Sequence, residues 1–180
     1  ELGIHYIVAY GMTETSPIVS MSRDLSHMDD WSLDEKIETR AMQGLTVPGI
    51  ESSIVNENGE VPWDGETMGE LRLRGPWIAA EYYKDERTAD AFMDGWLYTG
   101  DIAVRSKEGF IKITDRTKDL IKSGGEWISS VDLENALMSH PDVFEAAVLA
   151  VPHPKWQERP LACVVLKEGA IAQKDELVAS

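Results

Sequence analysis

The sequence predicts a mixed α/β (α+β) fold built from two parts, and three observations support this prediction. Short segments that alternate apolar and charged residues are closed by turns, which is typical of β-strands. A stretch with apolar residues at helical spacing follows Ser129 and Asp132, a capping-box-like pair. The amino-acid composition of the chain also changes near residues 115–119. We therefore expect one part over residues 1–115 and a second over residues 116–180.

The first part is expected to be rich in strands. The segment from Glu70 to Arg74 shows why, because Leu71 and Leu73 fall on one face of a strand and the charged residues fall on the other. Turn residues separate it from similar short segments on either side. The predicted strands cover residues 4–9, 50–55, 70–73, 102–105 and 110–114, and the predicted helices cover residues 33–40 and 85–93.

The second part is expected to combine strands with one well-defined helix. The helix is predicted over residues 131–139, and His140 and Pro141 are expected to end it. A further helix is expected to begin at Lys174. The predicted strands of this part cover residues 120–122, 143–151 and 161–166.

The single cysteine, Cys163, lies in the apolar segment 161–166. Free cysteine is among the most buried residue types, so we expect a core thiol rather than a nucleophile. One cysteine cannot form an intrachain disulfide, and this favours a reducing compartment, most simply the cytoplasm.

The charge balance excludes several classes of partner. The chain carries 17 Lys and Arg against 32 Asp and Glu, so its formal net charge is −15. Nucleic-acid binding needs a basic surface and is therefore not expected. No apolar run reaches the roughly 20 residues that a transmembrane helix needs. The chain begins without Met or a signal peptide and reads as a piece of a longer protein, while assembly into a homo-oligomer is left open.

Four local patterns carry more specific information. They are Tyr10-Gly11-Met12-Thr13-Glu14-Thr15, Gly69-Glu70-Leu71-Arg72-Leu73-Arg74-Gly75-Pro76, Trp96-Leu97-Tyr98-Thr99-Gly100-Asp101 and the segment from Asp115 to Glu126. In this order and spacing they resemble the adenylate-forming superfamily of acyl-CoA synthetases, luciferases and peptide-synthetase adenylation domains. The medium- or long-chain fatty-acid–CoA ligases are the most similar branch. The resemblance implies the end of a large N-terminal domain, its β-rich subdomain, followed by most of a small mixed α/β C-terminal domain.

The first pattern, by this resemblance, is a nucleotide-binding turn. Glu14 would hold Mg²⁺, which takes oxygen ligands and bridges carboxylates to substrate phosphates. Thr13 would hydrogen-bond a phosphate oxygen, and the Tyr10 ring would lie against adenine. Gly11 and Met12 complete the turn. Taken alone, the same residues are also compatible with a surface turn that carries a solvated glutamate.

The later patterns would supply the rest of the site. Asp101 would accept hydrogen bonds from the ribose hydroxyls, as carboxylates do in other nucleotide sites. Arg116 would contact the ribose and phosphate region, because a guanidinium makes paired bonds to oxygens. Lys118 falls where the family places the hinge between two poses of its small domain. The remaining residues expected to border nucleotide or coenzyme A are Lys122, Gly124, Gly125 and Glu126.

The implied activity is that of an acid–thiol ligase. A fatty or other carboxylic acid would react with ATP to give an acyl-adenylate and pyrophosphate, and coenzyme A would then take the acyl group. Thr13, Glu14 and Lys118 are the residues expected to serve catalysis. The Ser/Thr/Gly-rich phosphate loop and the Gly-Lys lysine of the family are absent from these 180 residues, so the chain alone is expected to be inactive. A nucleotide-binding module without catalysis, or an adenylation module linked to a carrier protein, is the alternative.

Overall fold

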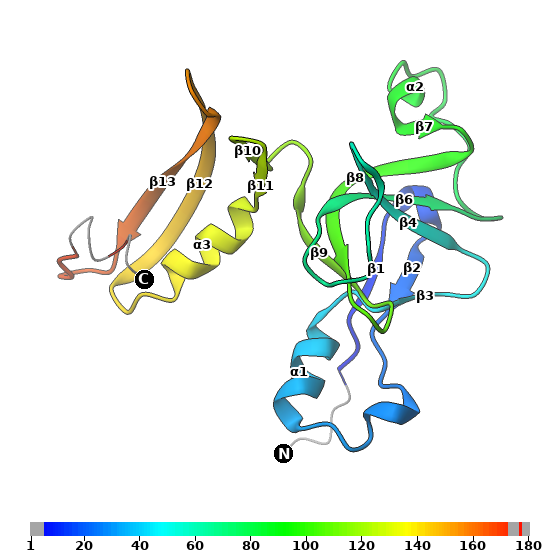
Figure 1. Cartoon of the computed structure of the whole chain (residues 1–180), viewed down its shortest axis with the longest axis horizontal. Coiled ribbons are helices and arrows are strands. Elements are labelled where there is room, and N and C mark those ends of the chain that lie inside the picture. Colours follow the sequence, from blue (N-terminus) through cyan, green and yellow to red (C-terminus); the bar gives the residue numbers. More distant parts are fainter. Residues whose placement is uncertain (1–5, 173–176, 178–180) are drawn as a thin grey trace. The chain divides into compact units, whose positions relative to one another are not determined.

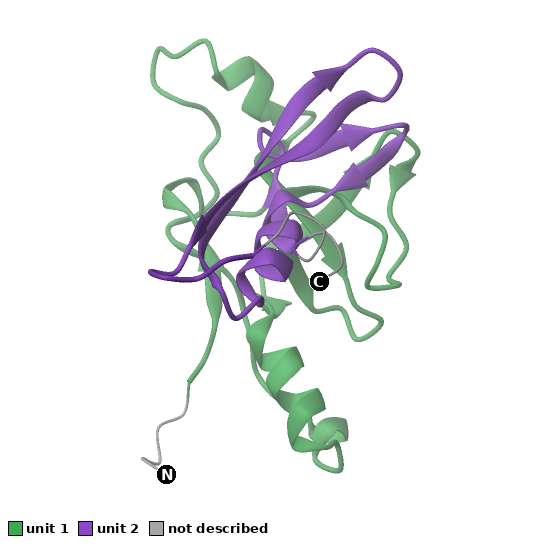
Figure 2. Ribbon diagram, turned by 90° about the vertical axis from the view of Figure 1, so that its left-hand side faces the viewer, with its two compact units in different colours: residues 1–113 green, residues 114–180 purple. Residues whose placement is uncertain are grey.

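A computed structural model describes residues 6–172 and residue 177 of the chain. The chain divides into two compact units, residues 1–113 and residues 114–180 (Figure 2). The division falls two residues before the expected boundary at 115 and 116. Among the described residues, no helix has the length and apolar character needed to cross a membrane.

The first unit is built from two antiparallel sheets (Figure 1). The smaller has the order β1-β2-β3, and the larger has the order β5-β4-β6-β8-β7 with β9 paired to β8. The strands of the smaller sheet are β1 (Ala9–Gly11), β2 (Ile18–Met21) and β3 (Leu45–Thr46). Those of the larger sheet are β4 (Glu51–Asn56), β5 (Gly59–Glu60), β6 (Gly69–Arg74), β7 (Phe92–Met93), β8 (Trp96–Arg105) and β9 (Ile111–Arg116).

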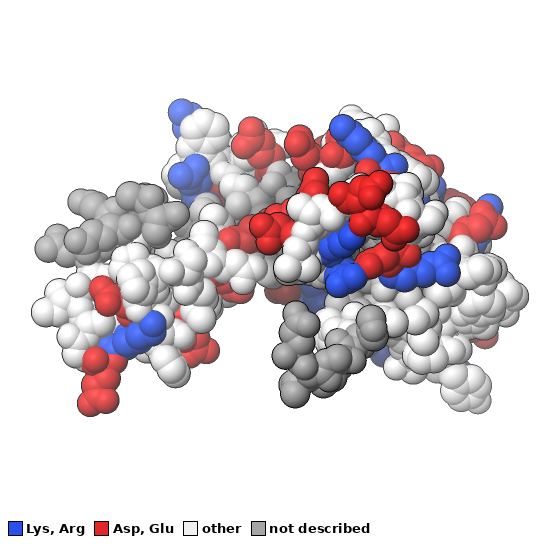
Figure 3. All heavy atoms as spheres, turned by 90° about the horizontal axis from the view of Figure 1, so that it is seen from below, with Lys and Arg blue, Asp and Glu red and all other residues white. Residues whose placement is uncertain are grey.

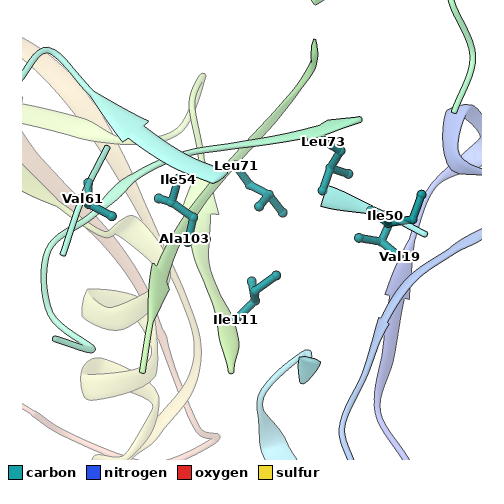
Figure 4. Packing of buried hydrophobic residues seen from close by; sticks show 8 residues of the cluster. All are labelled: Val19, Ile50, Ile54, Val61, Leu71, Leu73, Ala103 and Ile111. Carbon is teal, nitrogen blue, oxygen red and sulfur yellow. The ribbon is translucent and has the colours of Figure 1, made fainter. Parts of the chain in front are cut away.

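Side chains from both sheets form the core of this unit. Leu71 and Leu73 of β6 are fully buried, which confirms the alternation expected for that strand. Figure 4 shows them converging with residues from β2, β4, β8 and β9. The cluster comprises Val19, Ile50, Ile54, Val61, Leu71, Leu73, Ala103 and Ile111.

The helix predicted over residues 33–40 is confirmed as α1 (Leu33–Ala41). It begins with a capping box, because the Ser32 hydroxyl accepts a hydrogen bond from the Glu35 amide and the Glu35 carboxylate accepts one from the Ser32 amide. Two 3₁₀ helices lie before it, at Thr13–Thr15 and Ser26–Met28.

The helix predicted over residues 85–93 is wrong at both ends. Only α2 (Thr88–Ala91) is helical. At the start, the Asp85 carboxylate accepts hydrogen bonds from the Arg87 amide and side chain and so holds a turn. At the end, Phe92–Met93 pairs with β8 across Asp94 and Gly95, both at positive φ, which is the two-residue hairpin turn that suits twisted strands.

The strand predicted over residues 4–9 is also displaced. Residues 4 and 5 lie outside the described part of the chain, and residues 6–8 are not in a strand. The strand begins at Ala9, where it finds a partner in β2, with Tyr10 opposite Ser20. An apolar run shows that a segment can be buried, but it does not show which part will be paired.

The second unit is one antiparallel sheet with a helix. The sheet order is β11-β10-β13-β12, and α3 packs against β12. The predicted helix and strands are all present, with β12 and β13 longer than expected because they form one continuous hairpin. The helix expected from Lys174 lies outside the described residues, except for residue 177. The elements are β10 (Ile121–Ser123), β11 (Glu126–Ile128), α3 (Ser130–Met138), β12 (Val143–His153) and β13 (Gln157–Leu166).

Cys163 is exposed, so the expected core thiol is wrong. It lies on β13 opposite Ala147 of β12. Leu149 and Leu161 are paired two residues further along, on the same face of the hairpin, and they are 57% and 47% exposed. Val148 points to the other face and is 5% exposed, because that face packs against α3. An apolar segment predicted a strand here but not which of its faces is covered.

Candidate functional site

The turn after β1 presents Thr13 and Glu14 because Thr15 holds it from within. Thr15 is fully buried, and its hydroxyl lies 2.9 Å from the Met12 carbonyl and 2.8 Å from that of Pro17. The same oxygen accepts a hydrogen bond from the Met12 amide. Sequence reasoning had given Thr15 no role, although a threonine hydroxyl in a short segment after a strand is a common turn-forming group.

Gly11 is required by close packing of the backbone. A Cβ atom at this position would lie 1.5 Å from the Pro17 carbonyl oxygen, which belongs to the returning chain. The register between β1 and β2 shifts at this point, so the two backbones approach each other where the turn begins. A glycine here therefore shapes the turn without itself needing to contact a ligand.

The Glu14 carboxylate is held by a residue far along the chain. The Tyr82 hydroxyl donates a hydrogen bond to Glu14 Oε1 at 2.7 Å. The Ala79 amide donates to the Glu14 carbonyl at 2.8 Å, so the same segment also holds the main chain. The hydrogen bond to Glu14, followed by burial, raises the pKa of the Tyr82 phenol. Sequence reasoning had not connected Tyr82 with the first pattern.

Asp101 sits in an irregular part of β8. Tyr98 pairs with Arg72 and Ile102 with Glu70, so residues 99–101 all lie opposite Leu71. The Thr99 hydroxyl stabilises this bulge, since it donates to the Leu71 carbonyl at 2.7 Å and accepts from the Asp101 amide at 3.1 Å. A bulge re-aims side chains relative to a regular strand.

The bulge brings Asp101 to Tyr10. The Tyr10 hydroxyl donates a hydrogen bond to Asp101 Oδ2 at 2.6 Å. Gly100 allows this arrangement because it adopts a φ of +74°, and its amide donates to Glu70 Oε1 at 3.1 Å. The two residues that the resemblance assigns to the nucleoside, from patterns about 90 residues apart, are therefore in direct contact.

Arg116 and Lys118 lie in the second unit, in a tight turn. The Arg116 carbonyl accepts hydrogen bonds from the Asp119 and Leu120 amides, both at 2.9 Å. The Arg116 side chain is exposed. The Lys118 ammonium is 72% exposed and lies 4.0 Å from the Asp119 carboxylate. Both residues are thus exposed on their own unit.

Asp115, which begins the fourth pattern, was missed by sequence reasoning and is 5% exposed. Its Oδ2 accepts hydrogen bonds from the Ser130 amide at 2.6 Å and the Ser130 hydroxyl at 3.0 Å. Its Oδ1 accepts one from the Arg116 amide at 2.7 Å. The sequence does place an acidic residue, Asp115, before a helix that begins with Ser129 and Ser130. It does not show that the carboxylate and the start of the helix are in contact.

Gly124 and Gly125 form a defined hairpin turn between β10 and β11. They have φ values of +63° and +92°, and Ser123 pairs with Glu126 across them. Two successive positive φ angles are typical of a tight type I′ turn. The Gly124 amide donates to the Trp156 carbonyl at 2.9 Å. The backbone of this turn is therefore exposed, and hydrogen bonds and strand pairing define its shape.

Lys122 and Glu126 flank this turn. The Lys122 amide donates to Glu158 Oε2 at 2.7 Å, and its ammonium lies 5.7 Å from the centre of the Trp127 ring. Glu126 is exposed. The contact with Glu158 therefore holds the Lys122 main chain, and the Trp127 ring lies beside its ammonium.

The carboxylate oxygens available in the candidate site suit a metal ion that also binds the phosphates of the substrate. Among the described residues, no three His, Cys, Asp or Glu side chains are grouped to hold one. Mg²⁺ does not need such a group, because it commonly uses one or two carboxylates and takes its other oxygens from phosphates and water. Glu14, with one carboxylate oxygen bonded to Tyr82, fits that type of site.

The distribution of charge agrees with the composition. On the face drawn in Figure 3, acidic side chains lie beside the basic ones. With 17 Lys and Arg against 32 Asp and Glu, a broad cationic surface is not expected, and we interpret the basic residues singled out above as local contacts.

Comparison with known proteins identifies the family. Residues 1–83 match the model of the AMP-binding enzymes, and residues 132–180 match the AMP-binding enzyme C-terminal domain. A long-chain-fatty-acid–CoA ligase of Thermus thermophilus is 53% identical over 168 residues, covering 92% of this chain and 31% of the ligase. A medium-chain-fatty-acid–CoA ligase of Ectopseudomonas oleovorans is 45% identical over 164 residues, covering 91% and 30%.

Solved structures agree. An o-succinylbenzoate CoA synthetase of Bacillus subtilis, in complex with its acyl-adenylate intermediate, has a TM-score of 0.77 and 31% identity over 96% of this chain and 33% of that one. An ATP-bound MatB of Rhodopseudomonas palustris has a TM-score of 0.78 and 28% identity over 98% and 33%. This chain thus spans about a third of the length of these relatives. It belongs to the adenylate-forming superfamily of AMP-binding enzymes, as a segment that joins the end of the large domain to the C-terminal domain.

Proposed function

We propose that the protein containing this chain is an ATP-dependent acyl-CoA synthetase acting on a fatty acid. The carboxylate of the fatty acid attacks the α-phosphorus of ATP and releases pyrophosphate. The thiol of coenzyme A then attacks the acyl carbon and releases AMP. The hydrogen bond between Tyr10 and Asp101 is the observation that carries the proposal, because it joins the two residues that the family resemblance assigns to the nucleoside. The fatty-acid–CoA ligases among the relatives support the choice of acid.

In this proposal Asp101 binds the ribose. One carboxylate oxygen, Oδ2, already accepts the Tyr10 hydroxyl, and this bond fixes the orientation of the carboxylate plane. A carboxylate has about four lone-pair positions and can accept several hydrogen bonds at once, and we assign the ribose hydroxyls to this group. Tyr10 is half-buried and packs partly against the core cluster, and we place adenine against the remaining part of its ring.

Glu14 and Thr13 act on the phosphates. Glu14 would hold Mg²⁺, and the ion would supply positive charge to neutralise the phosphates. Thr13 is exposed at the tip of the turn, where its hydroxyl can hydrogen-bond a phosphate oxygen. Stabilising charge in this way, together with positioning, is the main means by which such sites lower the barrier.

The second unit supplies the movable part of the site. Arg116 contacts the ribose and phosphate region, and Lys118 is the hinge about which the C-terminal domain changes pose between the two half-reactions. Lys122 and the turn formed by Gly124, Gly125 and Glu126 border coenzyme A in the second pose. Their exposed backbone permits close approach of a narrow ligand.

The test uses the full-length protein and the Asp101→Ala variant. Loss of a charged hydrogen-bonding partner typically costs about 1.5–3 kcal/mol, so the ATP concentration for half-maximal pyrophosphate exchange should rise roughly 10- to 150-fold. Asp30→Ala removes an exposed aspartate elsewhere in the same unit and serves as the matched control. Unchanged ATP dependence of Asp101→Ala, with an intact circular dichroism spectrum, would remove Asp101 from the nucleotide site.

We also infer that these 180 residues do not make acyl-CoA alone. The phosphate loop and the Gly-Lys lysine that the resemblance requires do not occur in the sequence. Acid-dependent pyrophosphate exchange and hydroxylamine trapping should therefore give product with the full-length protein and none with the purified chain. Product from the chain would show that another lysine, such as Lys122 or Lys167, does this work. A cytoplasmic location remains a prediction from the single cysteine.

A further inference from the structure

We propose that Tyr82 is a positioning residue for the metal ligand Glu14, which it orients through its hydroxyl. The inference rests on the function proposed above, in which Glu14 receives a divalent metal. The two residues are 68 positions apart in sequence, and the Tyr82 hydroxyl lies 2.7 Å from Glu14 Oε1. The phenol therefore reaches the carboxylate from a different part of the unit.

Tyr82 is itself fixed from two sides. The Thr88 hydroxyl accepts a hydrogen bond from the Tyr82 amide at 3.0 Å and lies 3.2 Å from the Tyr82 carbonyl. The ring packs edge-to-face on Phe92, with ring centres 5.3 Å apart. Phe92 belongs to β7, which pairs with β8, so the phenol is anchored to the main sheet.

The segment around Tyr82 also holds the backbone of Glu14. We call residues 79–92 the strap, since it leaves the sheet after β6 and returns to it through α2 and β7 (Figure 1). At its start the Ala79 amide donates to the Glu14 carbonyl at 2.8 Å. Further along, the Arg87 guanidinium is bonded to Asp85 and lies 5.4 Å from the centre of the Tyr82 ring. The strap thus contacts Glu14 at both its main chain and its carboxylate.

The consequence for a metal is geometric. A glutamate carboxylate turns easily about its last bond and can offer either oxygen. When Tyr82 engages Oε1, the carboxylate plane is set, and Oε2 becomes the oxygen presented to the metal. Groups that hydrogen-bond to metal ligands in this manner typically change metal affinity or activity by roughly 10- to 100-fold when they are removed.

The experiment compares Tyr82→Phe with Tyr83→Phe in the full-length protein. Phenylalanine keeps the ring that packs on Phe92 and removes only the hydroxyl. Tyr83 is the next residue and is 84% exposed, so it is a matched control. We expect Tyr82→Phe to raise the Mg²⁺ concentration for half-maximal pyrophosphate exchange roughly 10-fold or more. At saturating Mg²⁺ its kcat should recover, which a general loss of structure would not allow.

A binding measurement separates metal affinity from turnover. Mn²⁺ binding in the presence of a non-hydrolysable ATP analogue, followed by electron paramagnetic resonance, should weaken in Tyr82→Phe and not in Tyr83→Phe. The double variant Glu14→Gln/Tyr82→Phe should bind Mn²⁺ no more weakly than Glu14→Gln alone, because Tyr82 acts through Glu14.

The outcomes distinguish two failures. If Glu14→Gln weakens Mn²⁺ binding but Tyr82→Phe does not, the positioning role is overturned while the metal role of Glu14 stands. If Glu14→Gln itself leaves Mn²⁺ affinity unchanged, the assignment of Glu14 as metal ligand is wrong. An equal effect of Tyr82→Phe and Tyr83→Phe would also overturn the positioning role. Should Tyr82→Phe not fold, Thr88→Val, which loosens the strap without touching Glu14, gives the same comparison.

Discussion

The Asp115 carboxylate binds the start of α3, where its Oδ2 accepts a hydrogen bond from the Ser130 amide at 2.6 Å. A negative charge is favourable at this end of a helix, because the first amides are unpaired and the helix dipole is positive there. The same carboxylate accepts the Arg116 amide. The backbone that carries Arg116 is thereby tied to the helix of its own unit.

Asp115→Asn should destabilise the second unit. Hydrogen bonds to charged groups contribute about 1.5–3 kcal/mol, and most of this should be lost from the free energy of unfolding. Amide hydrogen exchange of α3 in the full-length protein measures it, with Asp119→Asn as an exposed control. Equal protection of α3 in both variants would show that the cap is dispensable.

Gly11→Ala should disrupt the turn after β1 for steric reasons. The new methyl group would lie 1.5 Å from the Pro17 carbonyl oxygen, so the backbone must move. Gly59→Ala is the control, because Gly59 has a φ of +107° but open space around it, and its cost should stay near the roughly 1–3 kcal/mol of a strained backbone. Urea unfolding should rank Gly11→Ala as the more damaging change. The reverse order would contradict the close packing at Gly11.

Tyr82 should ionise above the ordinary tyrosine range. Its hydrogen bond to Glu14 raises its pKa above 10.0, since the neutral phenol is the donor. Because the pKa of Tyr82 is raised in the folded protein, the hydrogen bond contributes its full stabilisation of the fold below pH 10.0. This contribution is lost as the pH rises through the pKa of Tyr82 in the folded protein. Ultraviolet titration of tyrosinate, as the difference between wild type and Tyr82→Phe, should give a midpoint above 10.0. A midpoint at or below that value would argue against the bond in solution.

Cys163 of the 180-residue chain should react with a thiol reagent without denaturant. The residue is exposed on β13, so access does not require unfolding. Titration with a disulfide reagent should consume one thiol per chain under native conditions. Reaction only after addition of urea would restore the original expectation of a buried thiol.

Lys118→Pro should slow one half-reaction more than the other. Proline fixes φ near −65°, so a hinge at this residue could no longer adopt both of its conformations. Pyrophosphate exchange reports adenylation, and release of AMP on addition of coenzyme A reports thioester formation. Equal losses in the two assays would indicate damage to structure rather than to a hinge.

Local patterns predicted most of the elements. The alternation around Leu71 and the cap at Ser129 are properties of neighbouring residues, so β6 and α3 could be predicted. The exposure of Cys163 and the position of β1 depend on which distant segment covers or pairs with each strand. Those partners cannot be deduced from the segments themselves.

The same distinction holds for the candidate site. Tyr10, Glu14 and Asp101 were predicted because they lie in recognisable motifs. Tyr82 and Asp115 were not given a role, because each acts through one hydrogen bond to a residue that only the fold brings near. The roles of Tyr82 and Asp115 therefore depend on tertiary contacts, which no local sequence pattern predicts.

Both carboxylates assigned to nucleotide and metal are held by a phenol from elsewhere in the unit: Asp101 by Tyr10 and Glu14 by Tyr82. Nitrating oxidants attack tyrosine rings beside the hydroxyl, and the nitro group makes the phenol more acidic. At either position the donor would become an anion facing a carboxylate, and the attraction would turn into repulsion. Nitration of Tyr10 or Tyr82 is therefore expected to loosen the hold on its carboxylate.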